Sequence, residues 1–131
     1  MKIIDKLAWI EIKNDRILST RSTGKSVYYL PGGKRETGES DHEALVREIK
    51  EELSVTLIPD TLEYLSTFQA QAHGQPDGVK VKMTCYTGNY RGHLLAASEI
   101  EEIVWLTYAD REGVPPVDQL IFDWLRNKNM F

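Results

Sequence analysis

The 131-residue sequence has a single cysteine, few prolines and no long hydrophobic run. Because Cys85 has no partner cysteine, a disulfide within the chain is excluded, which fits a reducing compartment. No segment reaches the ~18 apolar residues that a membrane-spanning helix needs. Charges such as Asp5, Lys6 and Glu11 interrupt the N-terminal segment, which therefore lacks the apolar core of a signal peptide. We expect a cytoplasmic protein without membrane contact.

An excess of basic residues is also absent. The chain has 16 Lys and Arg against 20 Asp and Glu, a formal net charge of −4. Since nucleic-acid backbones are bound by basic surfaces, no nucleic-acid polymer is expected as a partner. An acidic protein that binds an anionic substrate needs positive charge from elsewhere, and a metal ion is the obvious source.

The length and a hydrophobic content of 41% predict one domain, residues 1–131, with a real core. β-Rich and alternating patterns predict several strands, and a turn at Asn14-Asp15 separates the first two. The motif HGQPDG is expected to join two later strands as a hairpin. Cys85 shares a strand face with Val81 and Met83, which favours a buried structural thiol. The predicted strands are 6–13, 15–22, 26–33, 62–72, 79–88 and 101–108.

Two helices are predicted. The first spans about 40–53, because Ser40 and Glu43 have the spacing of a capping box and apolar residues follow at steps of four. The second spans about 117–127 and has a regular apolar stripe. Together with the strands, the helices predict an α/β (α+β) fold in which a mixed sheet is sandwiched between helices. The stripe of the second helix consists of Val117, Leu120, Ile121, Trp124 and Leu125.

Three glutamates crowd the end of the first helix. With Leu45 at 0°, Glu48, Glu51 and Glu52 lie at about 300°, 240° and 340° around the helix, beside the apolar stripe. Glu48 and Glu52 are four residues apart, a like-charge spacing that costs a few tenths of a kcal/mol. One interpretation is a solvated acidic face with ion pairs to neighbouring basic residues. The other is a site for a hard divalent ion, Mg²⁺ or Mn²⁺, which gathers carboxylate oxygens.

The spacing of these residues resembles the Nudix box, G-x5-E-x7-R-E-U-x-E-E-x-G-U, in which U is aliphatic. The segment runs Gly33, five residues, Glu39, seven residues, Arg47-Glu48-Ile49, one residue, Glu51-Glu52, one residue, Ser54-Val55. Every fixed position matches except Ser54, where the box has glycine. The order of the surrounding elements is also similar to the Nudix α/β/α sandwich.

The resemblance implies that Glu48, Glu51 and Glu52 bind Mg²⁺ or Mn²⁺. It also implies that the backbone carbonyl of Gly32 joins them and that Arg47 orients the glutamates. By the same resemblance, Glu39 is a supporting residue and Gly33 allows a tight backbone path into the site.

The resemblance implies hydrolysis of a nucleoside diphosphate linked to another group, with a carboxylate that takes the proton of the attacking water. Within the box, Glu52 is the candidate for this proton acceptor. Outside it the candidates are Glu99, Glu101 and Glu102, of which we favour Glu99. The alternative for these three is a polar strand start.

Substrate contacts are expected from Lys34 and Arg35, which follow the glycines and could equally face water. Tyr28 is expected to line the cleft, although alternation places Tyr28 and Tyr29 on opposite faces and either could be core. For His73 a loop role is expected, with a ligand role as the alternative. Trp105 is expected in the core, with the cleft as the alternative.

The expected substrate is a small-molecule nucleotide. We expect a nucleoside triphosphate, standard or oxidised, that is cleaved to monophosphate and pyrophosphate. ADP-ribose or another sugar nucleotide, or a dinucleoside polyphosphate, is the alternative within the class. A non-catalytic nucleotide sensor is the alternative outside it, and isopentenyl diphosphate isomerisation lacks a suitable cysteine. Monomer and homodimer both remain open.

Ser54 occupies the place of a glycine that ends the helix in a left-handed conformation, where another residue costs ~1 kcal/mol. We expect Ser54→Gly to keep activity and to leave stability equal or higher.

Overall fold

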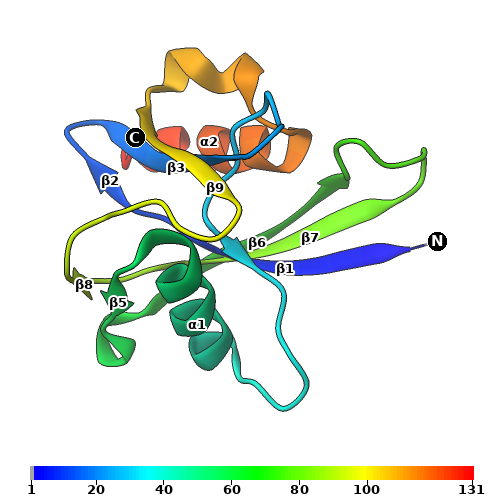
Figure 1. The fold of residues 1–131 in the computed structure, drawn as a ribbon. Helices are drawn as coiled ribbons and strands as arrows, with labels where there is room; N and C mark the ends of the chain where they lie inside the picture. The colour runs from blue at the N-terminus through cyan, green and yellow to red at the C-terminus, as the bar shows by residue number, and fades with distance from the viewer. Residues whose placement is uncertain (1) are drawn as a thin grey trace.

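Within residues 2–131, which the computed structural model describes, the chain forms two α-helices, nine strands and two 3₁₀ segments (Figure 1). The helices are α1 (Asp41–Leu53) and α2 (Pro116–Asn127), and the 3₁₀ segments are Pro59–Thr61 and Tyr108–Gly113. The strands are β1 (Ile3–Trp9), β2 (Ile12–Lys13), β3 (Arg16–Ser22), β4 (Gly32–Gly33), β5 (Thr56–Leu57), β6 (Glu63–Gln71), β7 (Lys80–Thr87), β8 (Tyr90–Arg91) and β9 (Ile100–Leu106).

The strands form a four-stranded sheet in the order β4-β1-β7-β6, a three-stranded sheet in the order β2-β3-β9, and the pair β5-β8. The four-stranded sheet is mixed, because β1 and β7 are parallel and its other pairs are antiparallel. In Figure 1, α1 lies on one side of the central strands and α2 on the other. The predicted mixed sheet between helices is therefore confirmed.

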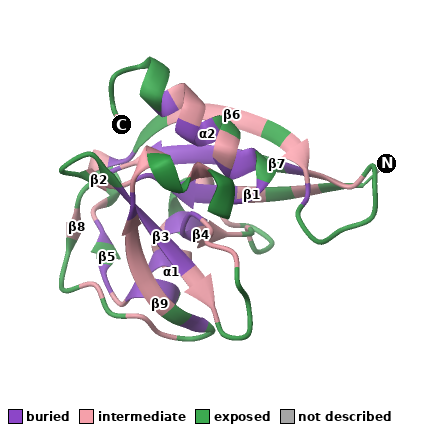
Figure 2. Ribbon diagram, turned by 90° about the horizontal axis from the view of Figure 1, so that it is seen from above, coloured by how far each residue is buried: buried purple, intermediate pink, exposed green. Residues whose placement is uncertain are grey.

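Strand β1 supplies side chains to both halves of the core. Leu7 and Trp9 pack in the cluster around α1, whereas Ala8 and Ile10 pack in the cluster around α2. Successive strand residues point to opposite faces, so a strand covered on both faces reads as a continuous apolar run. Each fully buried large side chain of this kind contributes roughly 1.5–3 kcal/mol. The buried residues run through the middle of the molecule, as Figure 2 shows.

The predicted single strand 6–13 is two strands. The chain leaves β7 after Trp9, and β2 then pairs with β3 in the other sheet. The strand is interrupted at Ile10 and Glu11, where the hydrogen-bonding partner changes from β7 to β3. No pattern of residues in the sequence predicts this change. The predicted turn is confirmed, since Asn14 and Asp15 both have positive φ, 51° and 61°, between β2 and β3.

The segment predicted as strand 26–33 is strand-like only in part: Tyr29 forms an isolated bridge with Thr20, and Gly32–Gly33 forms β4. The hairpin of β6 and β7 is confirmed, and Cys85 is buried within it.

The first helix has the predicted capping box. Ser40 Oγ accepts a hydrogen bond from the Glu43 amide, and the Glu43 carboxylate accepts one from the Ser40 amide, at 3.2 and 2.9 Å. Two of the four amides that a helix start leaves without partners are thereby satisfied.

The second helix is confirmed, but its buried face is rotated from the predicted stripe. Phe122 is fully buried, whereas Leu120 is 42% exposed. Asp118 also lies on the buried face. The prediction of Leu120 as a core residue was wrong, because α2 packs with positions 118, 121, 122 and 125 toward the sheet. Neither helix of the described chain has the length and apolar character that a bilayer span requires.

Candidate active site

Glu52 lies in the last turn of α1 and is buried, with 8% of its surface exposed. Its Oε1 accepts a hydrogen bond from the Gly32 amide at 3.2 Å. Burial raises the pKa of Glu52 to about 8, and the negative charges of Glu48 and Glu99 act in the same direction. A carboxylate is thus held at the junction of α1 and β4 although its ionised form is disfavoured there.

The glycine pair of β4 makes room for the neighbouring glutamate. A Cβ atom on Gly33 would collide with the Glu48 carboxylate, and a Cβ atom on Gly32 would collide with the Leu7 carbonyl. Gly32 also has φ of 149°, which a side chain rarely permits. Burial raises the pKa of Glu48, as it does that of Glu52. Gly33 therefore lets the Glu48 carboxylate approach the backbone of β4, and Gly32 lets β1 approach it.

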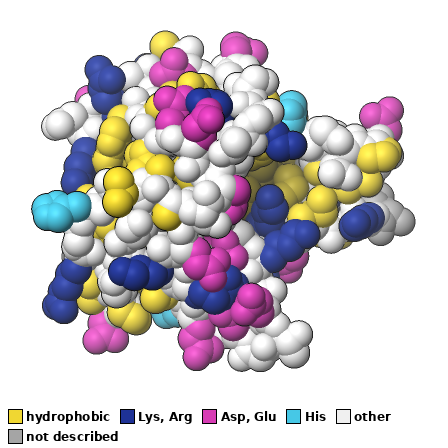
Figure 3. Space-filling model, in the orientation of Figure 1, with side chains coloured by type: hydrophobic (Ala, Val, Ile, Leu, Met, Phe, Trp, Pro, Cys, Tyr) yellow, Lys and Arg dark blue, Asp and Glu magenta, His cyan; other side chains and the backbone are white. Residues whose placement is uncertain are grey.

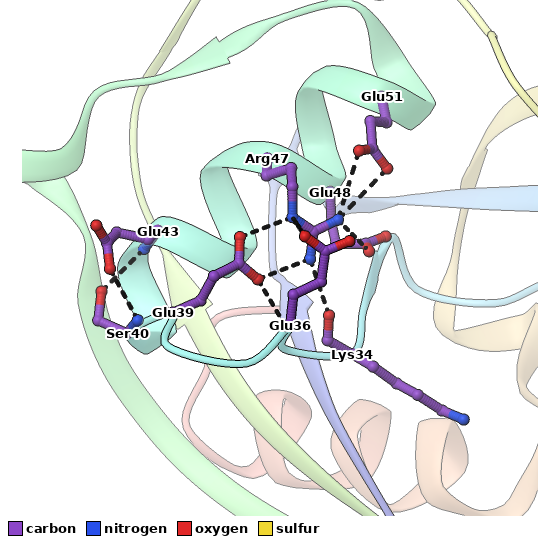
Figure 4. Close-up of polar contacts among 8 residues, drawn as sticks. All are labelled: Lys34, Glu36, Glu39, Ser40, Glu43, Arg47, Glu48 and Glu51. Atoms are coloured by element: carbon purple, nitrogen blue, oxygen red, sulfur yellow. Dashed lines mark hydrogen bonds and ion pairs between the residues drawn. The ribbon is translucent and has the colours of Figure 1, made fainter.

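Arg47 joins the helix to the loop before it (Figure 4). Its guanidinium donates two hydrogen bonds to Glu39, at 2.7 and 2.9 Å, one to Glu48 at 2.8 Å and one to the carbonyl of Lys34 at 3.0 Å. Glu51 lies slightly farther away, at 3.5 Å. The two-pronged contact holds the pKa of Glu39 near 2. Arg47 consequently restricts the positions of three glutamates.

A cavity of about 300 Å³ opens beside this cluster. Its walls come from β1, β3, β7, the segment before β4, the β6–β7 loop and the start of α2. Glu52 lines it, together with Lys6, Tyr29, Glu99 and Asp118. Figure 3 shows a hollow between the body of the molecule and the projecting ends of the long strands, lined by apolar side chains with basic side chains at its edge.

The acidic residues before and at the start of β9 separate into two groups. Glu99 lines the cavity and accepts a hydrogen bond from the Ser98 hydroxyl, which lowers the pKa of Glu99. Glu101 and Glu102 instead form ion pairs with Arg21, at 2.5 and 2.8 Å, and do not line the cavity. The structure therefore brings Glu99 toward Glu52 and leaves the other two outside.

Three predicted substrate contacts lie away from the cavity. Arg35 is held between Asp5 and Asp41 by ion pairs of 3.0 and 2.5 Å. The side chain of Lys34 points away from the glutamates in Figure 4. Tyr28 donates a hydrogen bond to Glu102 at 3.0 Å, so Tyr29, on the opposite strand face, lines the cavity in its place.

The remaining two candidates take different positions. His73 lines the cavity from the β6–β7 loop, where its ring stands edge-on to Tyr29 with centroids 6.4 Å apart. Trp105 packs against the core cluster around α1 and is not part of the cavity wall.

This combination of carboxylates, a glycine pair and an orienting arginine on a strand–loop–helix segment has a match among known families. Residues 7–125 match the model of the NUDIX domain. The chain belongs to the Nudix family. Membership indicates a hydrolase that acts on pyrophosphate bonds of small-molecule nucleotides, and family members generally use divalent metal ions.

Two Nudix relatives are similar over most of the chain. An ADP-ribose pyrophosphatase of Methanocaldococcus jannaschii is 31% identical over 126 residues, which are 92% of this chain and 71% of that protein. The uncharacterized Nudix hydrolase YvcI of Bacillus subtilis is 26% identical over 114 residues, 86% of this chain and 72% of that protein.

Solved structures share the Nudix fold. The E. coli ORF135 protein has a TM-score of 0.74 at 27% identity, with 96% of this chain and 92% of that chain covered. The MutT protein of Methanosarcina mazei has a TM-score of 0.79 at 19% identity, with 99% and 97% covered, and shows the likeness of fold alone.

Three charged residues of the Nudix cavity, Lys6, Lys25 and Asp118, were not among the predicted site residues. Lys6 served only as evidence against a signal peptide. Asp118 is fully buried: its Oδ2 accepts a hydrogen bond from the Leu30 amide at 2.9 Å, and its Oδ1 has no hydrogen-bond partner in the described part of the chain. Burial raises the pKa of Asp118 to about 7. The signal for Asp118 was available, because position 118 precedes buried residues of α2 by three, four and seven.

The donor set suits a hard divalent ion, although it is not preassembled. No three His, Cys, Asp or Glu side chains among residues 2–131 already form a cluster that would hold a metal. The buried Glu52 and the half-buried Glu48 nonetheless offer carboxylate oxygens whose charges repel each other, and Gly33 leaves space for that of Glu48. Carboxylate oxygens are the ligands that Mg²⁺ and Mn²⁺ prefer, and the ion would offset this repulsion. The residues therefore fit the metal that the family uses.

Proposed function

We propose that this Nudix protein hydrolyses a nucleoside triphosphate, standard or oxidised, to the nucleoside monophosphate and pyrophosphate. One observation carries the proposal: the box glutamate Glu52 and Asp118 line the same cavity, and among residues 2–131 one carboxyl oxygen of Asp118 has no hydrogen-bond partner. A nucleotide has an anhydride at one end and a base with hydrogen-bonding edges at the other. In this proposal Glu52 serves the anhydride end and Asp118 serves the base end.

In this proposal, Glu48, Glu51, Glu52 and the Gly32 carbonyl would hold Mg²⁺, with Mn²⁺ as a substitute. When bound, the ion supplies charge neutralisation at the phosphates and lowers the pKa of a coordinated water. The protein's own contribution is orientation. Arg47, fixed by two hydrogen bonds to Glu39, limits the rotamers of Glu48 and Glu51.

The reaction needs a proton acceptor. A water oxygen adds to phosphorus, the bridging P–O bond breaks, and pyrophosphate leaves with the electron pair. The water's proton passes to a carboxylate, for which we propose Glu52, the box glutamate that lines the cavity. Glu99 also lines the cavity and is the second candidate.

The base end of the site is proposed to lie at Asp118. A buried oxygen without a partner costs about 1–3 kcal/mol, and a hydrogen bond with the edge of a base would remove that cost. The apolar residues Leu30, Met83 and Val117 line the same cavity and offer contact to the faces of a ring.

ADP-ribose is the second candidate substrate, because the relative from M. jannaschii is an ADP-ribose pyrophosphatase at 31% identity. The sensor alternative requires binding without turnover. An isomerase is disfavoured, since burial raises the pKa of the Cys85 thiol well above its ordinary value and Cys85 does not line the cavity. The lone buried cysteine supports a cytoplasmic location within this proposal.

The test is a phosphate- and pyrophosphate-release screen over nucleoside triphosphates and ADP-ribose with Mg²⁺. We expect turnover that EDTA abolishes and that Glu52→Gln lowers by at least 100-fold, the usual contribution of a general base. Glu63→Gln is the matched control, because Glu63 is exposed on β6, away from the cavity. Turnover that survives EDTA or Glu52→Gln would contradict the mechanism, and binding without turnover of every nucleotide would favour the sensor.

A further inference from the structure

Lys6 lines the cavity from a part of β1 that pairs with β7 on one side only. Strand β4 covers β1 only at Leu7 and Ala8, so the edge of β1 before these residues carries no neighbouring strand. Lys6 is half-buried at this edge, faces the same side as Ala8, and lines the cavity. Lys6 thus shares the cavity with the carboxyl groups of Glu52, Glu99 and Asp118.

Two of the carboxyl groups that share the cavity with Lys6 suggest a function for it. Its positive charge acts on both Glu52 and Asp118, which line the cavity with it. Arg35 is neutralised by two ion pairs, but no ion pair within 4.0 Å engages Lys6 among residues 2–131. Lys25 also lines the cavity, but it is exposed at the rim. Among residues 2–131, Lys6 is therefore the half-buried cation of the cavity that forms no ion pair and is available to a ligand.

We propose that Lys6 binds the α-phosphate, the phosphate that stays on the nucleoside after hydrolysis. The inference rests on the proposed function: a nucleotide with its base at Asp118 and its anhydride at Glu52 has its α-phosphate between them. The ammonium group is a point charge on a flexible stem and donates up to three hydrogen bonds, which suits a tetrahedral phosphate. Half-burial weakens the screening of this charge by salt.

Product inhibition separates this role from general charge balance. The α-phosphate leaves on the nucleoside monophosphate and not on pyrophosphate. Loss of Lys6 should therefore weaken inhibition by the monophosphate and leave inhibition by pyrophosphate unchanged. Loss of a residue that merely balanced the charges of Glu52 and Asp118 would not weaken inhibition by the monophosphate selectively.

The experiment compares Lys6→Gln with Lys82→Gln, using the triphosphate that the wild type hydrolyses fastest. Lys82 is an exposed lysine on β7, opposite Asp5 in the register, and is absent from the cavity wall. For Lys6→Gln we expect a 10- to 100-fold lower kcat/KM and at least a 10-fold higher inhibition constant for the monophosphate, about the loss of one charge-assisted hydrogen bond. Lys6→Arg should recover part of both, and Lys82→Gln should match the wild type.

Equal inhibition constants for the monophosphate in wild type and Lys6→Gln, with both proteins folded by circular dichroism, would overturn the inference. So would equal weakening of inhibition by both products. If the wild type turns over no nucleotide, the proposed function fails, and metal-free calorimetry decides about Lys6 separately. The wild type should then prefer a nucleoside monophosphate to its nucleoside, and an unchanged preference in Lys6→Gln would refute the role of Lys6.

Discussion

Gly33 and Glu48 illustrate how a missing side chain creates room for a functional one. The Glu48 carboxylate occupies the space that a Cβ atom on Gly33 would fill. The displaced atoms would belong to the end of a flexible side chain, which can move at little cost to the fold. A substitution at Gly33 should therefore alter the site more than it alters stability.

We predict that Gly33→Ala lowers activity by about 10- to 100-fold and raises the Mg²⁺ concentration needed for half-maximal rate, the size of effect typical of a disturbed metal ligand shell. The measurement is a Mg²⁺ titration of turnover together with chemical denaturation. Gly113→Ala is the control, because a Cβ at Gly113 meets nothing within 4 Å. Full activity of Gly33→Ala at low Mg²⁺ would remove Glu48 from the proposed metal site.

The end of α1 depends on a residue that departs from the family pattern. Ser54 adopts φ of 66° and ψ of 13°, the left-handed conformation expected of the glycine it replaces. Its hydroxyl donates a hydrogen bond to the Leu95 carbonyl at 2.9 Å. The Leu95 amide in turn donates a hydrogen bond to the Leu53 carbonyl, and the Ala97 amide donates one to the backbone carbonyl of Glu52. Ser54 thereby fastens the loop that leads to Glu99 onto the helix.

The hydrogen bond changes what substitutions at Ser54 should do. Ser54→Gly relieves ~1 kcal/mol of left-handed strain but loses a hydrogen bond worth about 0.5–1.5 kcal/mol, so its stability should stay close to that of the wild type. Ser54→Ala keeps the strain and loses the hydrogen bond, and should be destabilised by about 1 kcal/mol, or roughly 4 °C. Urea unfolding of the three proteins measures the difference. Equal stability of the alanine variant and the wild type would show that the hydroxyl contributes nothing.

Local patterns predicted the elements well wherever each element contains its own signal. The capping box and apolar stripe located α1 to within a residue, and the turn at Asn14-Asp15 was correct. The box glutamates were equally visible, because their spacing lies within one helix. The rotation of α2 was missed, because Leu120 and Phe122 are equally apolar and only packing against the sheet distinguishes them.

The cavity could not be predicted, because its walls meet only in the folded chain. Lys6 comes from β1, Glu99 from the loop before β9, and Asp118 from α2. Nothing in the sequence near one of these residues refers to the others. The ion pair of Arg35 was equally unpredictable: its place after the glycines suggested a phosphate contact, and it pairs with Asp5 from the distant strand β1.

The burial of Asp118 predicts how the stability of the metal-free protein depends on pH. Its folded pKa, about 7, lies above its ordinary value near 4, so the folded state retains a proton that the unfolded state releases. Stability should fall between pH 4 and pH 7, by at most about 1.4 kcal/mol per pH unit from this group, and then level off. The charge of Lys6, from β1, lowers the pKa of Asp118. The charge of Asp118 in turn raises the pKa values of Cys85, from β7, and of Tyr29.

The measurement is urea unfolding of wild type and Asp118→Asn at pH 5 and pH 7.5 in EDTA. The difference between the two pH values should be smaller for Asp118→Asn, because asparagine does not titrate while its carbonyl can still accept the Leu30 amide. Identical pH dependence of the two proteins would show that Asp118 is ionised in the folded state at neutral pH.

The parallel pairing of β1 with β7 has a consequence for how the protein is made. Ile3 pairs with Lys80 and Trp9 with Tyr86. More than half of the chain must therefore be synthesised before β7, the neighbour of β1 in the sheet, is present. A ribosome therefore completes α1 and its glutamates well before the sheet on which α1 packs. A nascent chain that stalls before residue 116 would carry the acidic helix without Asp118, and hence without the far wall of the cavity. If Asp118 binds the base as proposed, recognition of the nucleotide is among the last properties to appear during synthesis.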